Sequence, residues 1–423
     1  MTRTLIISDL HLGGLSGVDV LRRPAVRAPL LERLADIDRL VLLGDVLELR
    51  HGPPHEALAA ARPFFEDVGR VLGGDRELIL TAGNHDHLNV CAWLDARALQ
   101  SPEPPPMALD QRIDPALASP LTAQIAAWAE PSRVSVAYPG LWVRPDVYAL
   151  HGHYLDAHLT IPTLERIGVG AIGRLLERRP SRADFGTVED YEAVTAPIYA
   201  WRDAMTRYGR SGPALNGLAT ARAWRALGGG DGVSRNGHGP GDGRPVDAKD
   251  TGGGGTGADG RRPAGALSAG GRRLAGMAGG WARQRAVKAA FPATVAGLNR
   301  AGLGPLSADI SRNELRRAGL CAIGEVAARL GLADAHVVFG HTHRTGPLPA
   351  DDVAEWRGRS GARLINCGSW VYEPIFLTRV PGESPYWPGA CVIVEDSGPP
   401  VLERLLKDAV PEEVARRASL SYT

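Results

Sequence analysis

The chain has 423 residues, with 48 lysine and arginine residues against 47 aspartate and glutamate residues. This length allows a full hydrophobic core, in two average domains or in one large domain with an insertion. The near balance of charge gives no global reason to expect a nucleic-acid partner. The four cysteines lack C-x-x-C spacing, so neither a zinc finger nor a disulfide framework is indicated and reduced thiols are expected.

The N-terminal residues show no export signal, because the first strand runs directly into Asp9 without a basic region, an apolar region and a cleavage site. No segment approaches the roughly 20 apolar residues that a membrane-spanning helix needs. We therefore expect a cytoplasmic protein without a transmembrane segment, either soluble or peripheral to the inner face of the membrane.

Short apolar, β-branched segments predict four buried strands in the first part of the chain. They are Thr4–Ser8, Leu40–Leu43, Leu78–Thr81 and Val147–Leu150. Apolar residues at helical spacing predict helices around residues 30–37 and 64–71, the second ending at Gly73. This alternation predicts parallel strands with helices over the faces of the sheet.

A cluster of polar residues follows each of these strands, and a fifth cluster follows a later strand. The clusters are Asp9-Leu10-His11, Gly44-Asp45-Val46-Leu47-Glu48, Gly83-Asn84-His85-Asp86, His151-Gly152-His153 and Gly340-His341-Thr342-His343. Because they leave the ends of buried strands, they should converge above one edge of a sheet. Carboxylate, imidazole and amide oxygen suit Mn²⁺, Fe²⁺ or Zn²⁺. One such triplet arises easily by chance, whereas five together indicate a two-metal hydrolytic site.

Residues 155–335 break the alternation of strands and helices. Apolar positions at helical spacing predict helices around 164–176, 191–201 and 326–330, which makes this segment a helical insertion or cap. Gly, Asp, Arg and Pro dominate residues 228–260. We expect that part to be disordered, because it cannot bury enough apolar surface to offset the entropy of ordering it.

A basic stretch follows, over residues 261–300. It contains no Asp or Glu, and its cations are Arg261, Arg262, Arg272, Arg273, Arg283, Arg285, Lys288 and Arg300. Trp281, Val287, Phe291, Val295 and Leu298 recur at roughly helical intervals, which predicts a basic amphipathic helix. It is either a solvated helix or a contact with an anionic membrane surface or a polyanionic substrate.

The last third of the chain contains five further apolar segments, with few helices between them. The predicted strands are Val337–Phe339, Arg363–Asn366, Phe376–Val380, Cys391–Val394 and Val401–Leu405. Residues 1–154 and 336–410 should therefore form one domain that residues 155–335 interrupt, followed by a tail at 411–423.

The five clusters resemble, in order and residue type, those of the calcineurin-like metallophosphoesterases, from the first strand to about Trp370. The resemblance implies an α/β (α+β) fold of two sheets packed face to face and flanked by helices. The second cluster, with Glu48, resembles the branch that hydrolyses UDP-2,3-diacylglucosamine. That branch often has G-N-R-D where this chain has Gly83-Asn84-His85-Asp86, so the identity of the substrate does not transfer.

The resemblance also implies a ligand set for two divalent cations, Mn²⁺ first and Fe²⁺ or Zn²⁺ as alternatives. One metal would be held by Asp9, His11 and His343, the other by Asn84, His151 and His341, with Asp45 bridging them. A metal-bridging hydroxide would attack phosphorus in line with the leaving group. His85 would face the substrate, protonating the leaving oxygen or stabilising charge on phosphate, unless it is a core histidine. Asp86 would orient the His85 ring and raise its pKa.

Three residues near the clusters have open roles. Glu48 is expected to orient a ligand rather than to bind metal. His153 either touches the site or lies on the surface. Arg344 either contacts a phosphate oxygen or pairs with an acidic residue. In addition, Asn366, Gly368 and Trp370 resemble a turn that closes the rim of the site in relatives.

These features predict a metal-dependent phosphoric ester hydrolase that cleaves a phosphodiester, phosphomonoester or pyrophosphate bond. A nuclease is one alternative, but it would need aromatic side chains beside the arginines, where only Trp281 and Phe291 occur. A non-catalytic scaffold is another, and it would be expected to have lost Asp45, His85 or His341, all of which are present.

Overall fold

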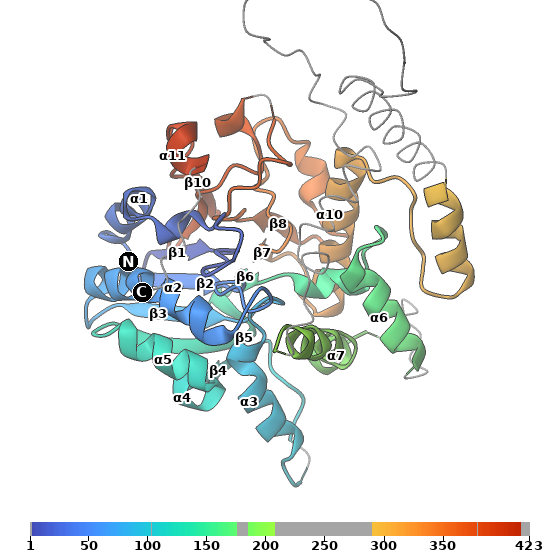
Figure 1. Cartoon of the computed structure of the whole chain (residues 1–423), viewed down its shortest axis with the longest axis horizontal. Coiled ribbons are helices and arrows are strands. Elements are labelled where there is room, and N and C mark those ends of the chain that lie inside the picture. Colours follow the sequence, from blue (N-terminus) through green and yellow to red (C-terminus); the bar gives the residue numbers. More distant parts are fainter. Residues whose placement is uncertain (1, 103, 176–184, 208–289, 379, 416–423) are drawn as a thin grey trace, which may run out of the picture.

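The computed structural model describes residues 2–102, 104–175, 185–207, 290–378 and 380–415. Within these residues the fold is mixed α/β with one large mixed sheet of ten strands (Figure 1). The strands are β1 (Thr4–Ile7), β2 (Arg39–Leu43), β3 (Glu77–Thr81), β4 (Asp110–Ile113), β5 (Arg133–Arg144), β6 (Val147–Leu150), β7 (His336–Phe339), β8 (Arg363–Asn366), β9 (Ala390–Val394) and β10 (Val401–Arg404). Their order in the sheet is β10-β9-β1-β2-β3-β5-β6-β7-β8, with β4 paired to β5.

The first part of the sheet has the predicted parallel pairing. Strand β1 pairs in parallel with β2, β2 with β3, and β3 with the first residues of β5. All four residues of β1 are buried, as are the last four of β2 and of β3. This burial explains why the strands read as continuous apolar segments rather than as alternating ones.

The long strand β5 joins this part of the sheet to the rest. It pairs with β3 at its start and antiparallel with β6 at its end, and β6, β7 and β8 then pair in parallel. The hydrogen-bonded path is thus continuous, and the expected pair of separate sheets stays a prediction. One apolar cluster takes its buried side chains from strands and from Cys367 next to β8, with no helical residue among its members.

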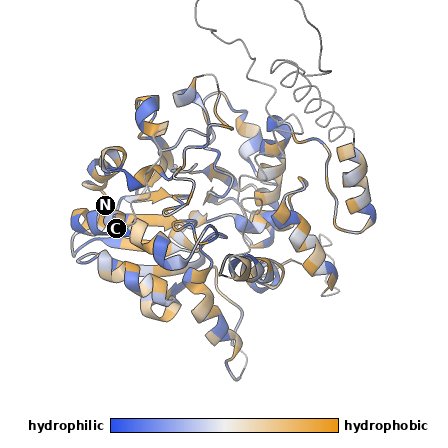
Figure 2. Ribbon diagram, viewed as in Figure 1, coloured by the Kyte–Doolittle hydropathy of each residue, from blue (hydrophilic) through white to orange (hydrophobic). Residues whose placement is uncertain are grey.

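Nine α-helices with described bounds and four short 3₁₀ helices accompany these strands in the described residues, and residues 290–300 are helical as well. The helices are α1 (Pro24–Leu34), α2 (Pro54–Leu72), α3 (Leu88–Ala98), α4 (Pro115–Ala118), α5 (Pro120–Trp128), α6 (Leu164–Leu175), α7 (Val188–Arg207), α10 (Arg312–Arg329), α11 (Pro411–Ala415), η1 (Val20–Arg22), η2 (His153–Ala157), η3 (Val353–Trp356) and η4 (Pro381–Glu383). Several begin with proline, whose fixed φ suits the first helical turn. Figure 2 shows apolar residues concentrated on the central strands and interspersed with polar ones along the helices.

Helix α2 follows from its sequence in a simple way. Phe64, Phe65, Val68 and Leu72 recur at helical spacing and are fully buried. The helix ends before Gly73, which has a φ of 66° that few other residues adopt. The predicted helix around 64–71 and its predicted end are therefore confirmed.

One predicted strand is wrong and two strands were not predicted. Residues Phe376–Val380, where described, form a turn and irregular backbone instead of a strand. The Phe376 ring stacks on Tyr386 with centroids 5.3 Å apart, so its apolar side chain is partly buried by packing between loops. Strands β4 and β5 were missed because β4 is polar and a proline, Pro139, lies inside β5.

The segment 155–335 contains the predicted helices as α6, α7 and a longer α10. The predicted disorder of 228–260 and most of the basic stretch lie outside the described residues, although residues 290–300 are helical. None of the described helices is both long enough and apolar enough to cross a membrane.

Candidate metal centre

The predicted donor residues follow the carboxyl ends of five strands, and their side chains converge. Asp9 comes two residues after β1, Asp45 two residues after β2, and Asn84 three residues after β3. His151 directly follows β6, and His341 comes two residues after β7. Two groups of donor atoms result from these residues, one around Asp9 and the other around Asp45, and His11, Glu48 and His85 form a third group beside them.

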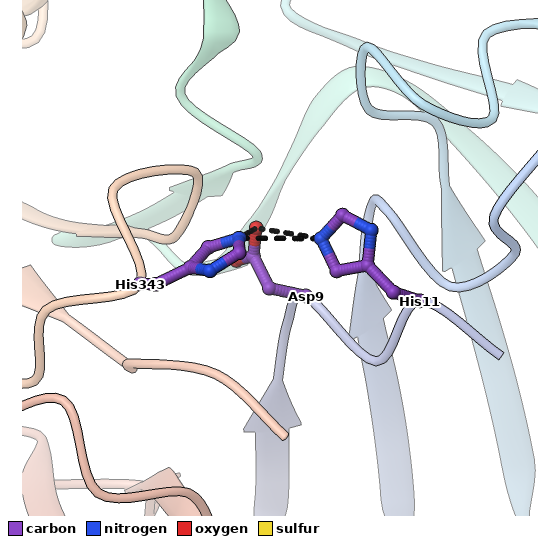
Figure 3. Close-up of side chains that lie close together, drawn as sticks. All are labelled: Asp9, His11 and His343. Atoms are coloured by element: carbon purple, nitrogen blue, oxygen red, sulfur yellow. Dashed lines mark hydrogen bonds and ion pairs between the residues drawn. The ribbon is translucent and has the colours of Figure 1, made fainter. Parts of the chain in front are cut away.

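The first group consists of Asp9, His11 and His343 (Figure 3). Asp9 Oδ1 lies 3.2 Å from His343 Nε2 and 3.9 Å from His11 Nε2, and the two Nε2 atoms are 3.2 Å apart. The other carboxylate oxygen of Asp9 accepts the backbone N–H of His341 at 2.9 Å. Oδ1 therefore remains directed at the two imidazoles.

The second group contains Asp45, His151 and His341, with Asn84 between the rings. Asp45 Oδ2 lies 3.3 Å from His151 Nε2 and 3.8 Å from His11 Nε2, so the same oxygen faces both groups. The amide oxygen of Asn84 is 3.2 Å from His151 Nε2 and 3.1 Å from His341 Nδ1.

These atoms carry lone pairs that face one another without a proton between them. The Asn84 oxygen faces two ring nitrogens, whose opposite ring nitrogens lie beside the Leu43 carbonyl and Asp156, and it also faces Asp45 Oδ2 at 3.1 Å. A rotated amide would instead donate hydrogen bonds at these three contacts and accept one from Arg50 Nη1. Asp9 Oδ1 is buried and accepts no hydrogen bond in the described structure. Such a set costs free energy unless a cation occupies its centre, so the residues fit divalent metal ions.

Each of the four histidines has an oxygen atom near its second ring nitrogen, at hydrogen-bond geometry for His11 and His151 and at ion-pair distance for His341 and His343. The pairs are His11 Nδ1 with Glu48 Oε2 at 3.0 Å, His343 Nδ1 with Glu373 Oε2 at 3.5 Å, His341 Nε2 with Asp156 Oδ2 at 3.2 Å, and His151 Nδ1 with the Leu43 carbonyl at 2.9 Å. A proton on that nitrogen sets the tautomer, leaving a lone pair on the nitrogen that faces the site. The roles of Asp156 and Glu373 carried no motif signal, because these residues approach the rings only in the folded chain.

The backbone of the donor residues is unusual. Six described residues other than glycine have a positive φ, and five of them are predicted ligands. They are Asp9 (56°), His11 (46°), Asp45 (51°), His341 (66°) and His343 (57°). Such conformations cost on the order of 1 to 3 kcal/mol each and persist where the surroundings enforce them, typically at functional sites.

Glycines in the clusters make room for this packing. A Cβ on Gly83 would lie 2.2 Å from Asp45 Oδ1. A Cβ on Gly340 would lie 2.2 Å from Ser8 Oγ and 2.4 Å from Asp9 Oδ2. The Gly-Asn and Gly-His pairs therefore reflect close contacts between different strand ends.

The expected pairing of Asp86 with the His85 ring is wrong. Asp86 is fully buried and accepts hydrogen bonds from the backbone N–H groups of Gly83, Asp45, Val46 and Leu47. Burial raises its pKa to about 6, with the neighbouring Asp45 charge adding to the effect. Asp86 thus holds the loop of Asp45 against the loop of Asn84.

The His85 ring is instead paired with Glu48. Its Nδ1 lies 2.8 Å from Glu48 Oε2, the same oxygen that contacts His11, and Glu48 Oε1 accepts the backbone N–H of Arg50 at 3.0 Å. Burial lowers the pKa of His85 to about 4, which Glu48 opposes and the Arg50 guanidinium reinforces. The expectation of a raised pKa is therefore wrong. With Nδ1 on Glu48, Nε2 is the nitrogen that can act on a substrate.

The contacts of the remaining residues are as follows. His153 is buried beside the His151 ring rather than on the surface. Arg344 makes a two-pronged ion pair with Asp351 and lies over the Trp356 ring. Asn366 donates to the Gly340 carbonyl and to Thr342 Oγ1, which braces the loop between His341 and His343.

The carboxylates and imidazoles of the site stabilise one another's charged forms. Burial acts to raise the pKa of Asp45, but the His151, His85 and His11 rings together hold it well below its ordinary value. Burial likewise acts to raise the pKa of Asp9, and His343 and His11 outweigh it. Both carboxylates are therefore ionised at neutral pH, as metal ligands must be.

A cavity of about 310 Å³ opens onto these donors. Its walls include Asp45, Asn84, His85, His341 and His343 from the sheet edge. Residues from α10 and from the segment around η2 also line it, among them Arg316 and Asp156.

No family model matches this chain, and no curated protein sequence matches it either.

Proposed function

We propose that the protein is a metal-dependent phosphoric ester hydrolase of the calcineurin-like type, with two divalent cations in its active site. The observation that carries the proposal is the sharing of Asp45 Oδ2 between two donor groups, 3.3 Å from His151 Nε2 and 3.8 Å from His11 Nε2. A single carboxylate between two imidazole-rich groups suits a bridge between two ions.

The proposed ligands keep the assignment implied by the resemblance. Asp9, His11 and His343 would hold one ion, Asn84, His151 and His341 would hold the other, and Asp45 would bridge them. Mn²⁺ is the first candidate, since mixed carboxylate, amide and imidazole donors suit it as well as Fe²⁺ or Zn²⁺.

We also propose that the sheet folds into the two facing layers of this family. The apolar cluster of strand residues supports this: Ile6 and Val41 come from one part of the path, and Val338 and Ile365 from the other. All four are nearly or fully buried, although no helical residue belongs to their cluster. The two parts of the sheet can bury this face by covering each other.

When bound, the two cations supply a water that loses its proton near neutral pH and positive charge beside the phosphate. Glu48, Asp156 and Glu373 keep the ring nitrogens aimed at the ions by holding the opposite sides of the rings. His85 lines the cavity beside Asp45, where its Nε2 can exchange a proton with the leaving oxygen or bond a phosphate oxygen.

The alternatives have weaker support. A scaffold that has lost its metals would not need five strained donor residues whose lone pairs converge. A nuclease would need a basic groove with stacking aromatic rings, and most of the basic stretch lies outside the described residues.

The test begins with metal-free protein prepared with a chelator and then titrated with Mn²⁺. We expect about two ions per chain by mass spectrometry and hydrolysis that appears with them. The substrate panel comprises a phosphomonoester, a phosphodiester, a nucleotide pyrophosphate and a UDP-linked lipid. Failure to bind Mn²⁺, Fe²⁺ or Zn²⁺, or full activity in the metal-free protein, would refute the proposal.

A further inference from the structure

A second and larger cavity, of about 930 Å³, lies between α3 and α7. In Figure 1 these two helices lie next to each other below β5, which is an inner strand of the sheet. Its volume is at the upper end of the range for pockets that bind small molecules, about 300 to 1,000 Å³. A hollow of this size among packed helices requires an explanation, since protein interiors are normally closely packed.

Much of the lining of this cavity is apolar, although Asp95, Arg97, Glu189, Glu192 and Asp203 also belong to its walls. Helix α3 contributes Leu88 and Leu94, and Leu49 and Met107 add further apolar surface. Helix α7 contributes alanines at positions 193, 196 and 200, a spacing that places them on one face of the helix. Their small side chains create the width of the cavity.

One end of the cavity reaches the candidate metal centre. Asn84 and His85 line both this cavity and the smaller one that contains Asp45 and His343. The buried Arg50 lines the same end, with its guanidinium over the Tyr199 ring and 3.5 Å from Glu165. A bound molecule could therefore have an anionic group at the metal centre and an apolar group between α3 and α7.

We propose that the substrate is a phosphoester with a long apolar group, and that this group occupies the cavity between α3 and α7 while the phosphate lies at the metal centre. This inference rests on the proposed function, because it places the reacting phosphate at Asp45 and His85. The apolar group supplies binding free energy through burial, and the cations carry the bond cleavage. A phosphoester of a small polar alcohol would leave the apolar walls unfilled.

The experiment uses phosphodiesters of 4-nitrophenol that carry a methyl, hexyl or decyl group as the second ester, below the concentrations at which they aggregate. With the Mn²⁺-loaded protein, kcat/KM should rise roughly threefold to fourfold for each methylene that enters the cavity. The 4-nitrophenol leaving group is the same throughout, so the rise reports the apolar group alone.

Ala196→Phe tests the location, because its ring would fill the space between the two helices. We expect it to abolish most of the preference for decyl over methyl ester. Ala200→Phe is a second variant on the more exposed part of the same face. The matched control is Ala96→Phe, at an exposed position of α3 outside the cavity walls, which should keep the wild-type preference. Unfolding midpoints of all variants show whether the fold is intact.

Binding of decylphosphonate and methylphosphonate by calorimetry gives a second readout without turnover. Tighter binding of decylphosphonate, with a negative heat-capacity change that Ala200→Phe reduces, supports the cavity. Equal kcat/KM for all three esters, or a preference that survives both α7 substitutions, overturns the inference and leaves the proposed function standing. If neither these esters nor any substrate of the four-member panel is hydrolysed, the proposed function fails, and equal binding of the two phosphonates then rejects the cavity as well.

Discussion

The edge of the sheet and the helices of segment 155–335 contribute to the same cavities in different ways. The sheet edge supplies all the proposed metal ligands, on short loops with strained backbone and with polar neighbours on every ring. Segment 155–335 supplies walls: α7 borders the larger cavity and α10 borders the smaller one. Under the proposed function, the difference teaches that the reaction chemistry would depend on a few fixed side chains and the choice of substrate on the space between helices.

The two regions are joined by polar contacts. Glu165 of α6 lies 3.5 Å from Arg50, and Glu192 of α7 lies 3.1 Å from His87 next to the third cluster. Asp156 contacts His341 directly. The walls therefore also position the metal centre, so the separation of roles needs testing residue by residue.

The largest effect is expected at the shared carboxylate. Asp45→Asn removes the charge between the two donor groups, so turnover should fall by roughly three orders of magnitude or more, with less metal bound. Asp75→Asn, at an exposed position, is the matched control. A variant that keeps two ions per chain and near wild-type turnover would show that Asp45 is not the bridge.

His85 lines both cavities, so its substitution tests whether a residue at the sheet edge acts on the substrate as well as on the metal. His85→Ala should lower turnover by roughly two to four orders of magnitude with both ions still bound, because the side chain acts on substrate. The loss should be greater for poor leaving groups. His55→Ala, at an exposed position outside the walls of both cavities, serves as control. If metal is lost together with activity, His85 is a ligand instead.

Arg344 directly follows the fifth cluster, so its substitution tests whether a residue next to the proposed metal ligands also takes part in the reaction. Arg344→Gln removes the two-pronged partner of the nearly buried Asp351 and leaves it only the longer contact with Arg316, at 3.6 Å, and the Leu348 N–H, so the free energy of unfolding should fall by roughly 2 kcal/mol in urea titrations. Turnover of the folded variant should change by less than about tenfold. Arg357→Gln, which is exposed, should stay within about 0.5 kcal/mol. A large loss of turnover at unchanged stability would assign Arg344 to the substrate.

Glu48 tests how much the neighbours of the ligands matter. Glu48→Gln weakens the hold on the His11 and His85 rings, so the affinity for Mn²⁺ should fall roughly tenfold to a hundredfold. Equilibrium dialysis measures this, with exposed Glu32→Gln as control. Complete loss of one ion at saturating Mn²⁺ would make Glu48 a ligand.

The smallest effect per residue is expected in the basic stretch, whose membrane contact stays a prediction. Replacing Arg272, Arg273, Arg283 and Arg285 with Gln should weaken binding to anionic vesicles by about 1 kcal/mol per charge near the surface, less at high salt. Cosedimentation measures this, and turnover of a soluble diester should not change. If the wild type does not bind vesicles, the membrane interpretation of the basic stretch fails. The interpretations as a solvated helix or as a contact with a polyanionic substrate would then remain.

The sequence by itself determined where the donor residues stand, because each cluster follows an apolar strand and the ends of parallel strands meet at one edge. Strands β1, β2, β3 and β6 and helix α2 were likewise predicted from apolar spacing. Those signals are local: a strand or helix and the residue after it lie within about ten positions of each other.

Only the tertiary structure decided which neighbours complete the site. It paired His85 with Glu48 instead of the adjacent Asp86, and His341 with Asp156, 185 positions earlier in the chain. It also opened the space between α3 and α7, whose leucines and alanines look like any helix surface in the sequence. These features depend on how distant segments pack, and a pattern of side chains along one segment contains no information about the surface that the segment will meet.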